Sequence, residues 1–219
     1  NPYANRDPRF EASILYDGSI WRGRAVECRL GGIEGIEKNG DATKTGYYSK
    51  KLLDESKENW GWGQQQGRNN WIHIRYAEVL LNYAEAQNEA VGPDATVYAA
   101  IDAVRARTGV NMPGLPVGLS QAEMRDKIIH ERRIELYKEE HRFFDLRRWG
   151  LAETLLNEPI NGIRIGPNGE LSGSDPNGGL YGIFQVETRT FLPQHYLAPI
   201  PQSEIDKLGT SVLPQNPGY

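Results

Sequence analysis

Residues 71–86 read WIHIRYAEVLLNYAEA, and this stretch decides the fold. Small and apolar side chains recur there at i, i+3, i+4 and i+7, with an Asn at i+11: Ala77, Leu80, Leu81, Ala84 and Asn88. This spacing is typical of one face of an amphipathic helix. Gly92-Pro93-Asp94 ends that helix and begins a second one, which Gly109 closes. A short connection makes the two helices antiparallel, as in one tetratricopeptide-like hairpin.

More helices are predicted after a Pro/Gly-rich connector at residues 110–119. Ser120 and Glu123 have the spacing of a capping box, in which each side chain bonds the other residue's backbone N–H. The helix that starts there runs through Met124 and Ile128 to Tyr137. Residues 141–156 are expected to form one or two short helices, interrupted near Gly150.

The two flanks of this helical part have a different composition. Phe10 to Tyr16 partly alternates and precedes Asp17-Gly18, which predicts a strand ending in a turn. Residues 31–46 hold five glycines and are predicted to be loop. Residues 157–219 carry no helical period. The chain is therefore predicted to be mainly α, with a loop- and strand-rich region at 1–70, a helical core at 71–156, an irregular region at 157–219, long loops and a few short strands.

Composition excludes some classes of function. The chain has 219 residues and a net charge of −4, with both signs scattered along it. No basic stripe exists of the kind that a phosphate backbone requires, so we expect no nucleic-acid partner.

The sequence contains no run of about 18 apolar residues, so it predicts no membrane-spanning helix. No signal peptide is recognisable, and the opening Asn1-Pro2-Tyr3 is typical of a chain that starts inside a larger protein. Cys28, the single cysteine, is expected to be a packing residue.

The densest charged segment is ERRIELYKEEHRFFDLRRWG at residues 131–150. Glu131 and Glu135 lie one helical turn apart, so some charges fall beside the apolar stripe. A buried charge is costly unless it is paired, and the planar guanidinium group suits carboxylates. We therefore predict a structural ion-pair network that joins four arginines to three carboxylates: Arg132, Arg133, Arg142 and Arg148 with Glu131, Glu135 and Asp145. A plain solvated face is the alternative.

Aromatic residues of the first region suggest ligand binding. Trp21, Tyr47, Tyr48, Trp60 and Trp62 stand among glycines and polar residues, outside any periodic stripe. An aromatic ring offers a large flat apolar area at low entropy cost, which suits the C–H face of a sugar. The stretch Gln64–Asn70, with Arg68 and Asn69, could bond the hydroxyl groups. The alternatives are that the rings serve to pack the fold and that the polar loop residues only keep the protein soluble.

Catalytic and metal signatures are weak. No two histidines stand at i, i+4, and no His/Cys cluster exists. A Ca²⁺ site is chemically plausible in the loop that holds Asn168, Glu170, Asp175 and Asn177. No Gly-x-Ser-x-Gly elbow or phosphate loop is present. We therefore expect no enzyme and no cofactor, and we leave the metal open.

Five ordered segments resemble the SusD/RagB family. They are NPYANRDPRF at residues 1–10, the helix at 71–86, AVRARTG at 103–109, the charged segment at 131–150, and the end of the chain with PIP at 199–201 and QNPGY at 215–219. The resemblance spans essentially residues 1–219 and is to the C-terminal portion of the family.

This resemblance implies a mostly helical, tetratricopeptide-like fold with a loop-rich glycan-binding face. It implies a surface-exposed lipoprotein of the outer membrane that captures oligosaccharides for import by a SusC-like, TonB-dependent transporter. It further implies that the N-terminal half of the same protein is a partner of this chain. Cys28 does not stand where the family carries its lipid-bearing cysteine.

Two other functions remain open from the sequence. Tetratricopeptide-like helices could form a scaffold that binds a peptide or a partner protein without a sugar site. A glycoside hydrolase would need two carboxylates in a cleft at working separation, for which the sequence gives no signal.

Overall fold

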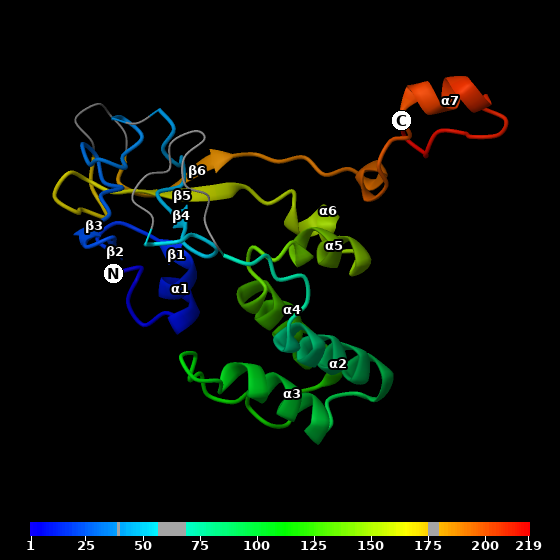
Figure 1. Ribbon diagram of the computed structural model, residues 1–219, viewed down its shortest axis with the longest axis horizontal. Helices are drawn as coiled ribbons and strands as arrows, with labels where there is room; N and C mark the ends of the chain where they lie inside the picture. Colours follow the sequence, from blue (N-terminus) through cyan, green and yellow to red (C-terminus); the bar gives the residue numbers. More distant parts are fainter. Residues whose placement is uncertain (39, 57–68, 175–179) are drawn as a thin grey trace.

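Three helices from the middle of the chain form the main packed block (Figure 1). The computed structural model describes residues 1–38, 40–56, 69–174 and 180–219. Helix α2 (Tyr76–Val91) and helix α3 (Ala95–Arg105) form the predicted antiparallel hairpin, and α4 (Gln121–Glu135) packs against α2. The core between them consists of Ala84, Val97, Ala100, Ile101, Met124 and Ile128.

The ends of these helices follow the signals in the sequence. Gly92 has a φ of +93° and ends α2, and the Asp94 side chain then caps α3 by accepting the backbone N–H groups of Thr96 and Val97. Helix α3 ends at Arg105, before the predicted Gly109. The capping box of Ser120 and Glu123 is present at the start of α4. Two short helices, α5 (His141–Arg148) and α6 (Ala152–Leu155), follow on either side of Gly150, as predicted.

The first region contains a helix where a strand was predicted. Pro8–Ser13 forms α1, and only Ile14–Leu15 (β1) is extended. Asp7 caps α1 through the N–H of Arg9, and Pro8 fits the first helical turn, where a missing N–H costs nothing. This N-cap favours a helix more strongly than the partial alternation of apolar residues favours a strand. Strand β1 pairs antiparallel with β4 (Tyr48–Ser49), and β2 (Ile20–Trp21) pairs with β3 (Arg24–Ala25).

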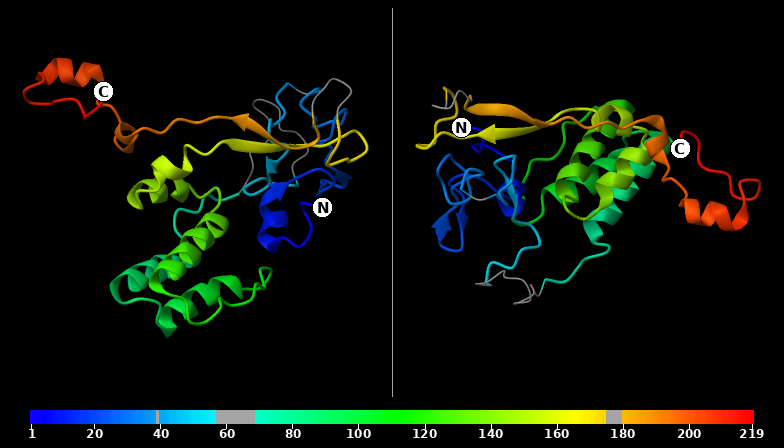
Figure 2. Two further views of the ribbon diagram at one scale, coloured as in Figure 1. Left: turned by 180° about the vertical axis from the view of Figure 1, so that it is seen from behind. Right: turned by 90° about the horizontal axis from the view of Figure 1, so that it is seen from above.

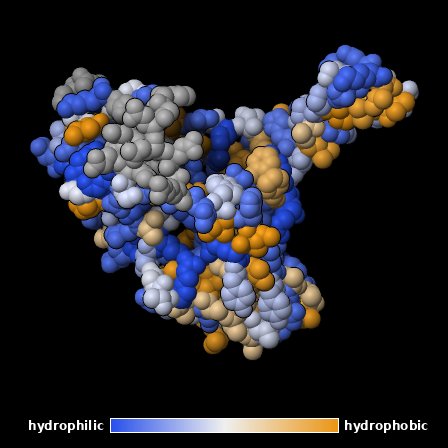
Figure 3. All heavy atoms as spheres, in the orientation of Figure 1, coloured by the Kyte–Doolittle hydropathy of each residue, from blue (hydrophilic) through white to orange (hydrophobic). Residues whose placement is uncertain are grey.

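The C-terminal region is more regular than predicted. Strands β5 (Ile160–Arg164) and β6 (Gly182–Glu187) form an antiparallel ribbon. A 3-10 turn, η1 (Pro193–Tyr196), and helix α7 (Gln202–Leu208) follow. The last residues form an arm that projects from the rest of the molecule (Figure 2), and apolar residues gather along one side of it (Figure 3). Among the described residues, every helix is too short or too polar to cross a bilayer.

Candidate functional site

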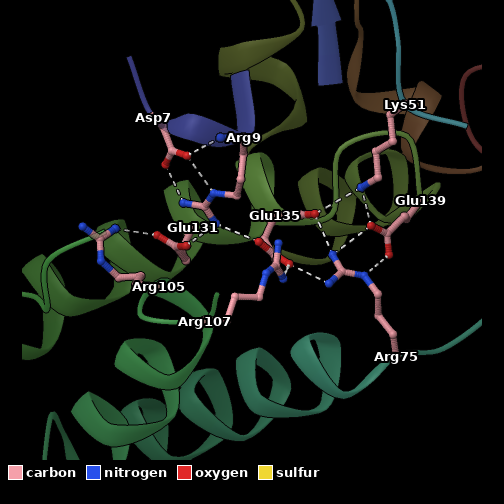
Figure 4. Close-up of polar contacts among 9 residues, drawn as sticks. All are labelled: Asp7, Arg9, Lys51, Arg75, Arg105, Arg107, Glu131, Glu135 and Glu139. Atoms are coloured by element: carbon pink, nitrogen blue, oxygen red, sulfur yellow. Dashed lines mark hydrogen bonds and ion pairs between the residues drawn. The ribbon is translucent and has the colours of Figure 1, made fainter. Parts of the chain in front are cut away.

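A row of three carboxylates joins the first region to the helical block (Figure 4). Glu131 and Glu135 lie on successive turns of α4, and Glu139 follows in the turn after it. Glu131 and Glu135 are both 2% exposed. Charged groups this deeply buried require partners.

Arg9 of α1 supplies one of these partners. Its Nη1 atom donates to Oε1 of Glu131 at 2.6 Å and to Oε2 of Glu135 at 2.8 Å. Its Nη2 atom donates to Asp7 at 2.6 Å, so the guanidinium group is surrounded by carboxylates on both sides. Arg9 is 6% exposed. It therefore fixes α1 onto α4.

The remaining partners come from other elements. Arg105 donates to Glu131 at 2.8 Å, and Arg107 donates to Glu135. Arg75, which precedes α2, donates to Glu135 and to Glu139, both at 2.6 Å. Lys51 lies 2.5 Å from Glu139. Sequence reasoning missed all of these cations, because they stand far from residues 131–150 along the chain and only the tertiary fold brings them together.

A second cluster holds α5 against α2. Arg132 and Arg148 contact Asp145 at 3.1 and 2.7 Å. Arg148 also donates to Glu85 on α2, at 2.7 Å through Nη2. The indole N–H of Trp149 donates to the same carboxylate at 2.8 Å. Five of the residues predicted for the network thus form ion pairs: Glu131, Arg132, Glu135, Asp145 and Arg148. Glu131 and Glu135, however, pair with arginines other than the predicted ones.

Arg133 and Arg142 differ from the other arginines of this segment. Within the described part of the chain, neither makes an ion pair, which departs from the predicted network. Arg133 occupies an exposed position on α4. The Nη1 atom of Arg142 is buried and has no hydrogen-bond partner there.

Ion pairs keep the Glu135 carboxylate ionised despite its burial. Burial alone would raise the pKa of Glu135, but hydrogen bonds from Arg107, Arg9 and Arg75 outweigh it, so the pKa is lowered. A carboxylate held ionised by several guanidinium groups cannot serve as a general acid at neutral pH. Glu135 can therefore join the elements of the fold, but it is not suited to the role of a general acid.

The residues predicted to contact sugar are only partly described. Trp60, Trp62 and Arg68 lie outside the described residues. Trp21 is half-buried on β2, and Tyr47 and Tyr48 are half-buried at β4 in the same part of the molecule (Figure 1).

Contacts within the first region hold the two tyrosines and Asn69. The Tyr47 ring packs edge-on against the Tyr3 ring at 6.2 Å between centroids. The Tyr48 hydroxyl donates to the Glu34 carbonyl at 2.9 Å. Asn69 is exposed and donates to the Leu52 carbonyl at 2.9 Å. Both tyrosines therefore support the loops in addition to any ligand contact.

The candidate Ca²⁺ loop is also only partly described. Asp175 and Asn177 lie outside the described residues. The Asn168 amide donates to Glu170 at 2.8 Å, which engages that carboxylate internally. No group of three metal-binding side chains is found among the residues that the structure describes.

Two cavities are relevant to ligand binding. A groove of about 1220 Å³ runs between the helices α4 to α6 and the segments around β4 and β5. A smaller pocket of about 210 Å³ lies beside Cys28 and Phe184. Burial raises the pKa of the Cys28 thiol to about 12, which makes it unreactive at neutral pH.

Comparison with known proteins identifies the family. The sequence matches the SusD family over residues 1–219, and the chain belongs to this family. A curated relative, SusD-like protein P2 from Formosa agariphila, is 34% identical over 160 residues, which cover 71% of this chain and 27% of the relative.

Solved structures agree with the fold. A SusD-like protein from Bacteroides fragilis superposes with a TM-score of 0.82 at 31% identity, over 99% of this chain and 40% of that protein. A SusD-like carbohydrate-binding protein from the same species gives a TM-score of 0.76 at 32% identity, over 94% and 41%. The predicted mainly α, tetratricopeptide-like fold is confirmed. The chain spans less than half the length of these relatives.

Proposed function

We propose that this protein binds oligosaccharides and does not cleave them. The observation that carries the proposal is membership of the SusD family together with 32% identity to a relative described as carbohydrate-binding. The loop- and strand-rich region at 1–70 would face the glycan, and the helical core at 71–156 would hold that region in place. The ion pairs from Arg9 and Lys51 to α4 and the turn after it support this arrangement, because they tie the two regions together.

Half-buried and non-periodic rings would supply the sugar contacts. Trp21 is only partly covered on its short hairpin, which leaves ring surface for a sugar face. Trp60 and Trp62 would add to this surface. Arg68 and Asn69 would bond hydroxyl groups, with Tyr47 and Tyr48 at the edge.

The proposal also includes a cellular location and a partner protein. The protein would be a lipid-anchored component of the outer-membrane surface that hands captured glycan to a SusC-like, TonB-dependent transporter.

Affinity gel electrophoresis in the presence of a panel of polysaccharides tests the binding. Trp21→Ala, Trp60→Ala and Trp62→Ala should each reduce retardation several-fold, since a stacked ring contributes about 1 kcal/mol beyond its buried area. Each variant should leave the melting temperature nearly unchanged. Tyr76→Ala is the matched control, because Tyr76 is 74% exposed on α2, outside the region 1–70. Equal mobility of the wild type and all three tryptophan variants would contradict the assignment.

A protein-interaction scaffold is the second candidate. The observation in its favour is an exposed stripe on α2, in which Tyr76, Val79 and Tyr83 are 74%, 48% and 45% exposed. Such a stripe suits a partner protein. Absence of glycan binding by calorimetry, together with specific binding of a purified SusC-like barrel, would favour this candidate.

A further inference from the structure

The pocket of about 210 Å³ lies between the loops of the first region and strands β5 and β6 (Figure 1). Backbone hydrogen bonds join its two walls. The Leu30 N–H donates to the Ile165 carbonyl at 2.9 Å, and the Ile163 N–H donates to the Thr45 carbonyl, also at 2.9 Å. Gly46 lies so close to β5 that a Cβ atom there would stand 2.6 Å from the Ile163 carbonyl oxygen. The fold itself therefore fixes the walls of this pocket.

The pocket adjoins residues that are proposed to contact sugar. Glu34 belongs to its lining, and the Glu34 carbonyl accepts the Tyr48 hydroxyl at 2.9 Å. The Glu34 carboxylate pairs with Arg24, which stands opposite Trp21 in the β2–β3 hairpin. The pocket is thus close to both rings, so a neighbouring unit of an oligosaccharide bound there can enter it.

Two cations of the lining have no carboxylate partner within the described part of the chain. The Arg164 guanidinium group makes no ion pair or hydrogen bond there, and it lies over the Phe184 ring at 5.3 Å from the centroid. Lys44 is exposed and also has no ion pair among the described residues. A third cation, Arg29, is paired with Asp17 at 3.0 Å. Arg164 and Lys44 are therefore available to a ligand.

The carboxylates of the lining do not neutralise these two cations. Glu34 accepts hydrogen bonds from Arg24, which outweigh burial and lower the pKa of Glu34. Its carboxylate also accepts the backbone N–H of Glu27 at 2.9 Å. Glu37 is exposed and makes no ion pair with either cation in the described part of the chain. Two unpaired cations therefore accompany one unpaired carboxylate, which leaves the pocket with a surplus of positive charge.

The size and chemistry of the pocket restrict its ligand. Pockets for drug-sized ligands have volumes of about 300–1,000 Å³. The smaller volume of about 210 Å³ suits a single small unit. Phe184 and Val186 are half-buried and Ile36 is 47% exposed, so apolar surface is available to the C–H groups of a sugar ring. A guanidinium group without a protein partner can bind a carboxylate or a tetrahedral oxyanion through paired hydrogen bonds.

We propose that this pocket binds an acidic unit of a glycan, either a uronate or a sulfated sugar. The anionic group of that unit pairs with Arg164 and Lys44, and its C–H groups pack on Ile36 and Val186. A neutral unit of the same size lacks the group that pairs with the cations, so it gains less from the pocket. The inference rests on the proposed glycan binding and adds the class of glycan, which is acidic.

Isothermal titration calorimetry with matched polysaccharides tests the preference for charge. Polygalacturonate and alginate are each compared with their methyl esters, and a sulfated galactan is compared with its desulfated form. The members of each pair share a backbone and differ in charge. We expect the protein to bind the charged member of at least one pair about tenfold more tightly, with an affinity that falls as salt is added. A preference within the ester pairs identifies a carboxylate as the bound anion, and one within the galactan pair identifies a sulfate ester.

Variants of the lining locate the acidic unit. Arg164→Gln should weaken binding of the charged glycan about tenfold, as expected for the loss of a charge-assisted hydrogen bond, and leave binding of the neutral form unchanged. Lys44→Gln should weaken it about threefold, because the ammonium group is exposed. Arg164→Lys keeps the charge and should recover part of the affinity, which separates the loss of charge from a loss of structure.

Lys38→Gln is the matched control. Lys38 is an exposed cation of the same loop and lies outside the pocket lining. Its substitution changes the net charge by the same amount as Lys44→Gln does. It should leave the affinity for the charged glycan nearly unchanged.

The outcomes distinguish this inference from the proposed function. Equal affinity for the charged and neutral members of every pair would overturn the acidic ligand and leave glycan binding intact. A preference for charge that persists in both Arg164→Gln and Lys44→Gln would place the acidic unit elsewhere. Displacement of the charged glycan by inorganic phosphate as effectively as by galacturonate would assign the pocket to a free anion. Absence of binding to every polysaccharide would contradict the proposed function, and the acidic ligand with it.

Discussion

Arg9 and Glu135 are 126 residues apart in the sequence, yet Nη1 of Arg9 lies 2.8 Å from Oε2 of Glu135. Both side chains are almost fully buried. The pair sits where α1 meets α4, so the position of the loop-rich region relative to the helices depends on it (Figure 4).

Glu135→Gln should destabilise the protein strongly. The amide keeps the size of the side chain but removes the charge that Arg9, Arg75 and Arg107 share. Removing one partner from a buried ion pair costs about 3–5 kcal/mol. Urea unfolding followed by circular dichroism measures the loss. Glu89→Gln is the control, since Glu89 and Arg125 pair at the surface and should contribute little. Equal midpoints for both variants would contradict a structural role for Glu135.

Stability should fall in acid because of the same carboxylates. The folded-state pKa of Glu135 and of Glu139 is lowered, as hydrogen bonds from cations outweigh burial. A lowered folded-state pKa contributes stability above the unfolded value of about 4.3, and this stability is lost as the pH falls through the folded pKa. The melting temperature should be level between about pH 8 and pH 6 and drop below about pH 4.5. A smaller acid-induced drop is expected for Glu135→Gln; an identical drop would show that other groups dominate.

Ser120→Ala should cost about 1 kcal/mol, the usual contribution of a helix N-cap. The Ser120 hydroxyl accepts the N–H of Glu123, and the Glu123 carboxylate accepts the N–H of Ser120. Loss of the hydroxyl leaves a backbone donor of α4 without its protein partner. Thermal unfolding measures the effect, and Ser203→Ala, at an exposed position of α7, serves as the control. A change no larger than that of the control would count against the cap.

Cys28 should resist alkylation in the folded protein. Burial raises the pKa of its thiol to about 12, and only the thiolate reacts with iodoacetamide. At pH 8, labelling in water should be at least tenfold slower than labelling in urea, as followed by intact mass. Similar rates in both conditions would place Cys28 in an exposed position.

Local signals explain which parts of the fold were predictable. Helices α2 and α4 show their period and their ends in the sequence, because each depends on residues three or four positions apart and on a nearby cap. Strands β5 and β6 were missed, since pairing across a long Gly- and Asn-rich connection leaves little local signal. Helix α7 was missed as well, because its seven residues are too few to show a period.

The sequence by itself determined the helical hairpin, the capping box and the family, since these depend on spacings along the chain. It also indicated that residues 131–150 needed charge partners. Only the tertiary structure decided which cations these are: Arg9, Arg75, Arg105 and Arg107 approach Glu131 and Glu135 from distant elements. It also left the Nη1 atom of Arg142 without a hydrogen-bond partner among the described residues. The physical reason is that burial makes each charge depend on its neighbours in space, which spacing along the chain does not encode.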